Sequence, residues 1–260
     1  MSDRYAKQRI FLGRDADEAL RSKRVAILGL GALGSVIAPW LARAGVGHLT
    51  LIDRDLVETS NLQRQLLYGE SDLGRPKAEV AAERLAEANS TLELKAVVAD
   101  LTSGNARELL SGFDLICDGT DNFEARFLIN DVALLTGTPW IYAGAIGGEG
   151  VVWPLHPPHT PCLRCLLEEP PGSGDVDTCD SAGVLGPAVG IIASWAALEA
   201  LKSKEYFEYG VLQPIGEGQS VFLGFVLHDH SMGDGPHGLA VHISESQGRR
   251  EITLIGWLDS

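Results

Sequence analysis

The chain has 260 residues and a mass of 27.8 kDa, enough for one or two domains with a substantial hydrophobic core. Hydrophobic residues make up 45% of it and charged residues 22%, which is typical of a folded soluble protein and excludes a wholly disordered one. Thirty-five acidic against twenty-one basic residues leave a formal charge of −14 that repels nucleic acids and anionic membranes. We therefore expect neither partner, and we expect any bound polyanion to lie in a local nest of backbone amides and cations.

Three further features of the sequence concern its compartment. The first ten residues carry charges and no apolar segment, so no signal peptide is predicted. The longest uncharged apolar stretch, residues 183–198, falls short of the roughly 20 residues that cross a bilayer, and we expect a buried helix there. Four cysteines favour metal binding or thiol chemistry over a disulfide framework. These features predict a cytoplasmic protein.

The first half of the chain alternates short apolar runs with segments of helical periodicity. A strand at residues 24–29 runs into glycines, a helix follows at 32–44, and a second strand at 48–53 completes a β-α-β unit with parallel strands. The alternation continues with helices expected at 77–88 and 123–135 and strands at 92–98, 113–118 and 139–143. This pattern predicts an α/β fold with a Rossmann-like doubly wound sheet, parallel in its N-terminal half.

The character of the sequence changes after Gly144. We expect a strand at residues 151–155, a proline- and glycine-rich crossover loop at 168–181 and a helix after Gly183. Strands at 220–227 and 251–255 are expected to continue the fold as a C-terminal antiparallel layer. We therefore divide the chain into a nucleotide-binding part, residues 1–145, and a substrate-binding part, residues 146–260, within one compact unit.

A glycine motif follows the first predicted strand. Gly29, Gly31 and Gly34 form a G-x-G-x-x-G that opens a helix, as in dinucleotide-binding proteins, where backbone amides approach phosphate oxygens. Asp53 ends the second strand, where a carboxylate can accept hydrogen bonds from a ribose. These residues predict a bound nucleotide and leave its identity open.

Cations beyond the second strand favour a triphosphate. Residues 60–65 read Ser-Asn-Leu-Gln-Arg-Gln, and Arg75 and Lys77 follow shortly afterwards. A hydride-transfer site requires no such cluster, whereas a departing pyrophosphate is stabilised by positive charge. A nicotinamide dehydrogenase is therefore the weaker interpretation, although each of these cations taken singly is more often a solvated surface residue.

A series of motifs between residue 4 and about residue 200 occurs together in one order. They are Arg4–Gln8, the glycine loop, Asp53 with Ser60–Gln65, Arg75–Lys77, Asp118–Asn122, Cys162–Cys165 and Cys179–Pro187. Through them the chain resembles the bacterial homologues of ubiquitin-activating enzymes, the ThiF, MoeB and HesA group of adenylyltransferases that activate sulfur-carrier proteins.

The resemblance implies ATP-dependent adenylation of a carrier's C-terminal glycine carboxylate, with release of pyrophosphate, for thiamine, molybdopterin or related sulfur-transfer synthesis. It implies a homodimer, a small ubiquitin-like partner ending in Gly-Gly, and a sulfurtransferase as a further candidate partner. Adenylation of a peptide or another carboxylate is the alternative, and a nucleotide-binding scaffold without chemistry is a rival from another class. Retention of Arg64, Lys77 and Asp121 argues against the scaffold.

The resemblance also assigns site residues. It places ATP against the glycine loop and Asp53, Ser60, Asn61, Gln63, Arg64, Lys77, Asp121 and Asn122. Asp121 is implied to hold magnesium, because hard cations prefer carboxylate oxygen, although capping of the following helix by Asp121 or Asn122 is the structural alternative. The carrier's carboxylate is already ionised, so catalysis needs positioning and charge neutralisation and no general base.

Two departures from the family pattern stand out. The cation donated across the dimer is usually an arginine beside the N-terminal glutamine, but Lys7 occupies that position and Arg9 lies two residues further on, so either is a candidate. Members with structural zinc carry two C-x-x-C pairs, whereas this chain has only Cys162 and Cys165. A zinc site completed by histidines among His228, His230, His237 and His242 is left open.

Cys179 is the remaining candidate for chemistry. It precedes a predicted helix start, which lowers a thiol pKa, but Asp175, Asp177 and Asp180 oppose that effect. In the resemblance the matching cysteine bonds covalently to the carrier in some members and is dispensable in others. We expect adenylation itself to proceed without this thiol, because attack on phosphorus by a carboxylate involves no sulfur.

Overall fold

The computed structural model describes residues 3–157, 159–172, 182–201, 238–246 and 249–258. The chain divides into two units, Met1–Leu201 and Lys202–Ser260. The described residues of the range 146–201 belong to the same unit as the N-terminal half. The assignment of a function to each part stays a prediction.

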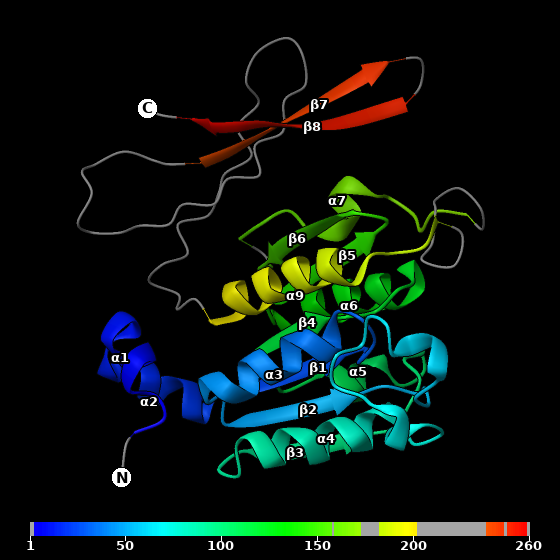
Figure 1. The fold of residues 1–260 in the computed structure, drawn as a ribbon. Coiled ribbons are helices and arrows are strands. Elements are labelled where there is room, and N and C mark those ends of the chain that lie inside the picture. The colour runs from blue at the N-terminus through cyan, green and yellow to red at the C-terminus, as the bar shows by residue number, and fades with distance from the viewer. Residues whose placement is uncertain (1–2, 158, 173–181, 202–237, 247–248, 259–260) are drawn as a thin grey trace. The chain divides into compact units, whose positions relative to one another are not determined.

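A six-stranded sheet forms the centre of the first unit, with the strand order β3-β2-β1-β4-β5-β6 (Figure 1). The first five strands run parallel, and β6 pairs antiparallel with β5. The strands are β1 (Arg24–Leu28), β2 (His48–Ile52), β3 (Glu93–Val97), β4 (Leu115–Asp118), β5 (Trp140–Ile146) and β6 (Glu149–Leu155). The predicted doubly wound α/β sheet is thus confirmed.

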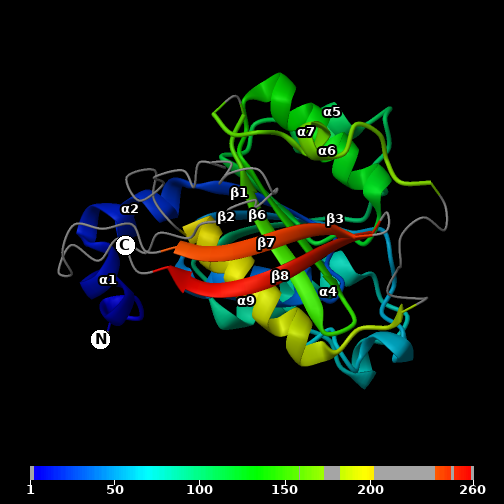
Figure 2. The same ribbon diagram turned by 90° about the horizontal axis from the view of Figure 1, so that it is seen from above.

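Helices cover both faces of this sheet (Figure 2). One face packs against α3 (Gly34–Ala44), α4 (Lys77–Ala88) and α9 (Gly186–Leu201), and the other against α5 (Ala106–Leu110) and α6 (Phe123–Thr136). The remaining helices are α1 (Ala6–Leu12), α2 (Arg14–Ser22), α7 (Leu163–Leu166) and the short 3-10 turns η1 (Thr59–Asn61) and η2 (Glu70–Asp72). None of the described helices is both long and apolar enough to cross a membrane.

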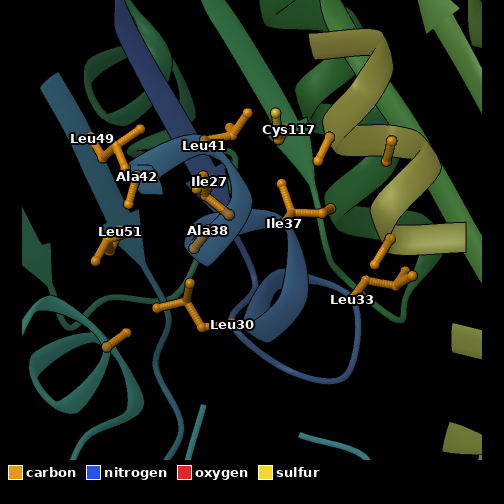
Figure 3. Packing of buried hydrophobic residues seen from close by; sticks show 14 of the residues in the cluster. Ile27, Leu30, Leu33, Ile37, Ala38, Leu41, Ala42, Leu49, Leu51 and Cys117 are labelled. Atoms are coloured by element: carbon orange, nitrogen blue, oxygen red, sulfur yellow. The ribbon is translucent and has the colours of Figure 1, made fainter. Parts of the chain in front are cut away.

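The side chains of β1 divide between two hydrophobic clusters. Val25 and Ile27 face the α3 side, whereas Ala26 and Leu28 face the α6 side, and all four are buried. A strand buried on both faces reads as a continuous apolar run, which is why the sequence revealed it. Figure 3 shows Ile27 among the side chains of α3 and β2 on the first of these faces.

Most predicted elements are present with ends shifted by a few residues, but α1, α2, α5 and α7 were not anticipated. The second unit contains an antiparallel pair, β7 (Gly238–Ser246) and β8 (Arg249–Leu258), and the strand expected at 251–255 lies within β8. The strand expected at 220–227 lies outside the described residues, as does the crossover loop from residue 173. The described antiparallel strands are β6 and this pair, of which β7 was not anticipated.

Three backbone segments meet at the junction where β1 and β4 end. A Cβ on Gly34 would lie 1.9 Å from the Gly29 carbonyl oxygen, and one on Gly119 would lie 2.4 Å from the same oxygen. Gly29 itself has φ +82°, a conformation that favours glycine. Because strand order reverses between β1 and β4, this contact occurs where ligands bind in open α/β sheets.

We predict that Gly34→Ala destabilises the protein by about 1–3 kcal/mol, because the added methyl group forces the loop after β1 away from α3. Gly148→Ala is the matched control, since a Cβ there meets no atom within 4 Å. Urea unfolding of both variants measures the difference. Equal losses of unfolding free energy would show that the junction is not crowded.

Candidate active site

The loop between β1 and α3 leaves one glycine without a packing role. A Cβ on Gly31 would meet only the Gln65 Nε2 atom, at 3.7 Å, so the protein itself does not require glycine there. Gln65 is buried, and its Oε1 atom has no hydrogen-bond partner in the described structure. The open backbone at Gly31, with the amide nitrogen of Gln65 beside it, fits a nucleotide whose phosphates approach the loop.

Asp53 holds this loop to the end of β2. Its Oδ2 atom accepts a hydrogen bond from the Leu30 amide at 2.6 Å, and its Oδ1 atom accepts one from the Asp55 amide at 2.7 Å. Burial raises the pKa of Asp53, although these two amides and the charge of Lys77 act against the rise. The predicted ribose acceptor is therefore also a structural residue of the loop.

Tyr68 is a site residue that the sequence analysis missed. Its buried hydroxyl donates to the Leu30 carbonyl at 2.9 Å and lies 3.4 Å from the Lys77 carbonyl oxygen. Burial raises the pKa of this hydroxyl, so it remains a donor at neutral pH. A tyrosine close behind the Ser60–Gln65 run was the available clue, but its partner lies 38 residues away.

Lys77 and Arg64 approach the site from different segments. Lys77 begins α4 and is only 5% exposed, and its Nζ donates to the Asp55 carboxylate at 3.1 Å. Because Asp55 is itself exposed, it does not isolate this ammonium from an incoming anion. Arg64 donates to the Ser60 carbonyl at 2.9 Å, and its Cα lies 3.6 Å from the Cβ position of Gly186 at the start of α9.

The other predicted residues of this segment differ in exposure. Asn61 is buried, and its Oδ1 atom accepts a hydrogen bond from the Glu58 amide at 3.2 Å, which fixes the turn η1. Ser60 and Gln63 are exposed. Asn61 therefore shapes the segment from within, while Ser60 and Gln63 remain accessible to a ligand.

The segment after β4 shows which of Asp121 and Asn122 caps the following helix and which is available to bind a cation. Asn122 caps α6, since its Oδ1 accepts a hydrogen bond from the Ala125 amide at 2.8 Å. Asp121 is exposed, and the described structure shows no hydrogen bond or ion pair to its carboxylate. Helix capping thus explains Asn122 and leaves the Asp121 carboxylate available for a cation.

A buried ion pair lies beneath this segment and was also missed. Arg126 donates to Asp118 at 3.3 Å, to the Thr120 carbonyl at 3.0 Å and to the Ala143 carbonyl at 3.2 Å. Burial raises the pKa of Asp118, while Arg126 and hydrogen bonds from Thr120 lower it. Arg126 therefore ties the end of β4, and with it Asp121, to β5.

The two N-terminal cations have different surroundings. Arg9 donates to the buried carboxylate of Asp17 at 2.8 Å and also pairs with Asp3. Lys7 is exposed, and no ion pair to it occurs in the described part of the chain. Of the two candidates for a cation donated to another chain, Lys7 is the one not already engaged.

Comparison with known proteins decides the family. The model of the ThiF family matches residues 5–212, which is most of the chain. The chain belongs to the ThiF family.

Two relatives in this family are bacterial. The sulfur carrier protein ThiS adenylyltransferase of Bacillus subtilis is 42% identical over 206 residues, which cover 78% of this chain and 61% of the relative. The sulfur carrier protein adenylyltransferase of Thermus thermophilus is 41% identical over 207 residues, covering 77% and 76%. The chain thus spans about three fifths of the first relative and three quarters of the second.

Comparison with solved structures shows which known proteins share the fold. Escherichia coli MccB crystallised with ATP has a TM-score of 0.71 at 19% identity, covering 98% of this chain and 72% of MccB. At that identity the likeness extends to the fold alone. It agrees with a ThiF-family core built on the six-stranded sheet.

The cysteines do not reproduce a closed zinc site. The Cys162 and Cys165 sulfurs lie 3.5 Å apart, but the described residues contain no group of three His, Cys, Asp or Glu side chains that could hold a metal. The zinc expectation therefore finds no support there. Cys179 and three of the histidines, His228, His230 and His237, lie outside the described residues, and for His242 only the strand is described.

We predict that Tyr68→Phe lowers the free energy of unfolding by about 1–2 kcal/mol, because the buried Leu30 carbonyl loses its hydrogen bond. Tyr142→Phe is the control, since the described structure shows no hydrogen bond to that hydroxyl. Urea denaturation followed by fluorescence compares them. Losses of the same size would mean that the Tyr68 hydroxyl does not hold the loop.

Proposed function

We propose that this ThiF-family chain adenylates the C-terminal glycine carboxylate of a small ubiquitin-like sulfur-carrier protein with ATP and Mg²⁺, releasing pyrophosphate. The names of the two bacterial relatives support the reaction and the class of partner. The observation that carries it here is the open backbone at Gly31, beside the Gln65 Nε2 atom and in a loop held by Asp53.

The site residues suit the parts of ATP. Amides of the loop containing Gly29, Gly31 and Gly34 would contact phosphate oxygens, and Asp53 has further acceptor capacity for ribose hydroxyls. Lys77 and Arg64 would offset the charge of the phosphates, with Ser60 and Gln63 lining the approach and Asn61 holding their turn in place. Asp121 would hold Mg²⁺, which would neutralise charge on the leaving pyrophosphate.

In the adenylation step no side chain of the protein needs to form a covalent bond with the reactants. A carboxylate oxygen of the carrier attacks the α-phosphorus, and the bond from that phosphorus to the bridging oxygen of pyrophosphate breaks. The nucleophile is already ionised at neutral pH, so no side chain needs to take a proton. The cations then act by stabilising charge that moves onto the leaving group, and the loop acts by holding the reacting atoms in line.

We further propose a homodimer in which Lys7 of one chain reaches the phosphates bound by the other. Two large apolar side chains on the same helix, Ile10 and Phe11, are each 81% exposed, which favours their burial against a second copy. Arg9 would instead stabilise the N-terminal helices through Asp17. The pathway, any sulfurtransferase partner and a covalent role for Cys179 depend on which carrier is used.

The proposal predicts exchange of labelled pyrophosphate into ATP that depends on a carrier ending in Gly-Gly. Arg64→Ala, Lys77→Ala and Asp121→Ala should each lower it by about 10²-fold or more, because each removes charge that opposes or holds the polyanion. Asn122→Ala and Lys95→Ala are the controls, for loss of helix capping and for loss of a distant cation. Lys95 lies on the edge strand β3.

A panel of carriers and short peptides makes the exchange measurement decisive. Exchange with a carrier only would identify the partner class, and exchange with a short peptide only would favour the alternative carboxylate substrate. Wild-type rates in all three variants would overturn the site. Adenylation should survive Cys179→Ala, since no thiol takes part in that step.

If Lys7 acts at the site of the other chain, two inactive variants should restore each other's activity in mixed dimers. Lys7→Ala and Arg64→Ala chains, inactive separately, should regain activity on mixing, up to about a quarter of wild type when half of the dimers are mixed and each has one intact site. Arg9→Ala mixed with Arg64→Ala tests the competing cation in the same way. Mixed dimers that form but stay inactive, or a monomer in sedimentation, would refute the arrangement.

A further inference from the structure

The pair Cys162 and Cys165 is left without a role by the proposed function. Its sulfurs lie 3.5 Å apart at the start of α7, with Cys165 exposed and Cys162 partly buried. The whole sequence has only two other cysteines, and no second C-x-x-C pair. Cys117 is fully buried in the strand β4, where burial raises its thiol pKa to about 12 and removes it from such chemistry.

The backbone that carries the pair is fixed to α6, which lies beside α7 (Figure 2). Arg164 makes two hydrogen bonds of 2.8 Å to the Asp131 carboxylate, and its guanidinium lies 4.8 Å from the centre of the Phe127 ring. The Leu163 amide donates to Asn130 Oδ1 at 2.8 Å. Rotation of the cysteine side chains can therefore bring the sulfurs together while the backbone between them is held.

The two thiols have different surroundings, and the nearby Asn130 contributes to the difference. It is fully buried, its Oδ1 is used by Leu163, and its Nδ2 has no conventional hydrogen-bond acceptor in the described structure. Partial burial raises the pKa of Cys162, but hydrogen bonds from Cys165, the Arg164 amide and Asn130 bring it below its ordinary value. Hydrogen bonds from backbone amides to its sulfur favour a thiolate at Cys162.

We propose that Cys162 and Cys165 form a redox-active dithiol that closes reversibly to an intramolecular disulfide by exchange with an external disulfide. The Cys162 thiolate attacks one sulfur of the external disulfide, forming a mixed disulfide and releasing one thiolate. Cys165 then loses its proton to solvent and attacks the Cys162 sulfur, releasing the second thiolate. The protein loses two electrons and two protons, and the external disulfide is reduced to two thiols.

The distance suits this chemistry. The two sulfurs must approach from 3.5 Å to the S–S bond length of about 2.05 Å, which side-chain rotation can supply. A zinc site at the same place would need two further ligands, and the described residues provide none. The pair is therefore better suited to a dithiol than to half of a metal site.

The test equilibrates the full-length chain with mixtures of reduced and oxidised glutathione, followed by acid quenching, alkylation and mass spectrometry. We expect loss of the mass of two hydrogens and a disulfide-linked peptide joining Cys162 and Cys165, reversed by excess reduced glutathione. Cys117 should remain reduced throughout and serves as the internal control. Both thiols staying reduced in pure oxidised glutathione would overturn the proposal, as would one zinc ion per chain in untagged protein.

Single variants test the asymmetry. Cys165→Ser should trap glutathione on Cys162, and Cys162→Ser should react at Cys165 at least about tenfold more slowly. Asn130→Asp, in the Cys165→Ser background, keeps the acceptor for the Leu163 amide but replaces the unpartnered nitrogen by a carboxylate oxygen, whose negative charge opposes a thiolate on the neighbouring Cys162 and should slow trapping about tenfold. Circular dichroism checks that each variant is folded. Equal rates in all three would remove Cys162 as the attacking thiol and refute the proposed sequence of steps.

Discussion

Close packing of three glycine backbones is the constraint on which the site depends. Gly29 follows β1, Gly34 begins α3 and Gly119 follows β4, and the Gly29 carbonyl oxygen leaves no room for a Cβ on either partner. This contact brings the loops after β1 and β4 together at the point where strand order reverses. Gly31 lies between Gly29 and Gly34 but escapes the crowding. The backbone most accessible to a phosphate is therefore positioned by its neighbours, which cannot move without separating two strands.

The candidate site gathers positive charge in a molecule whose overall charge is negative. With a net charge of −14, the surface disfavours a triphosphate, so attraction must come from groups held close to it. Lys77 meets this need because burial shields its ammonium from bulk water while Asp55, its partner, stays exposed. An incoming phosphate can compete with Asp55 at little cost, since an ion pair with an exposed partner is worth little. Arg64 adds a second cation from the segment that contacts the start of α9.

Elements with local patterns were predictable, and contacts between distant segments were not. The central strands β1 and β4 were readable because both of their faces are buried, and α4 begins at Lys77 as predicted, where Pro76 provides an extended residue before it. The helices α1 and α2 were missed because they are short and bury almost nothing, with no buried residue in α1 and only Asp17 in α2. Tyr68 and Arg126 were missed for a different reason. Their hydrogen-bond partners lie on other strands and loops, and no spacing along the chain reports such contacts.

The pair Asp118 and Arg126 shows why such contacts matter for chemistry. Removing both charges from water costs several kcal/mol per ion, and in many proteins an apolar pair would be as stable. Arg126 repays part of that cost with hydrogen bonds to the carbonyls of Thr120 and Ala143 and by lying over the Tyr142 ring. An apolar side chain would leave these two carbonyls without a donor. The pair therefore selects one geometry for the segment after β4, and Asp121, which follows Thr120, takes its position from a charge that never meets the ligand.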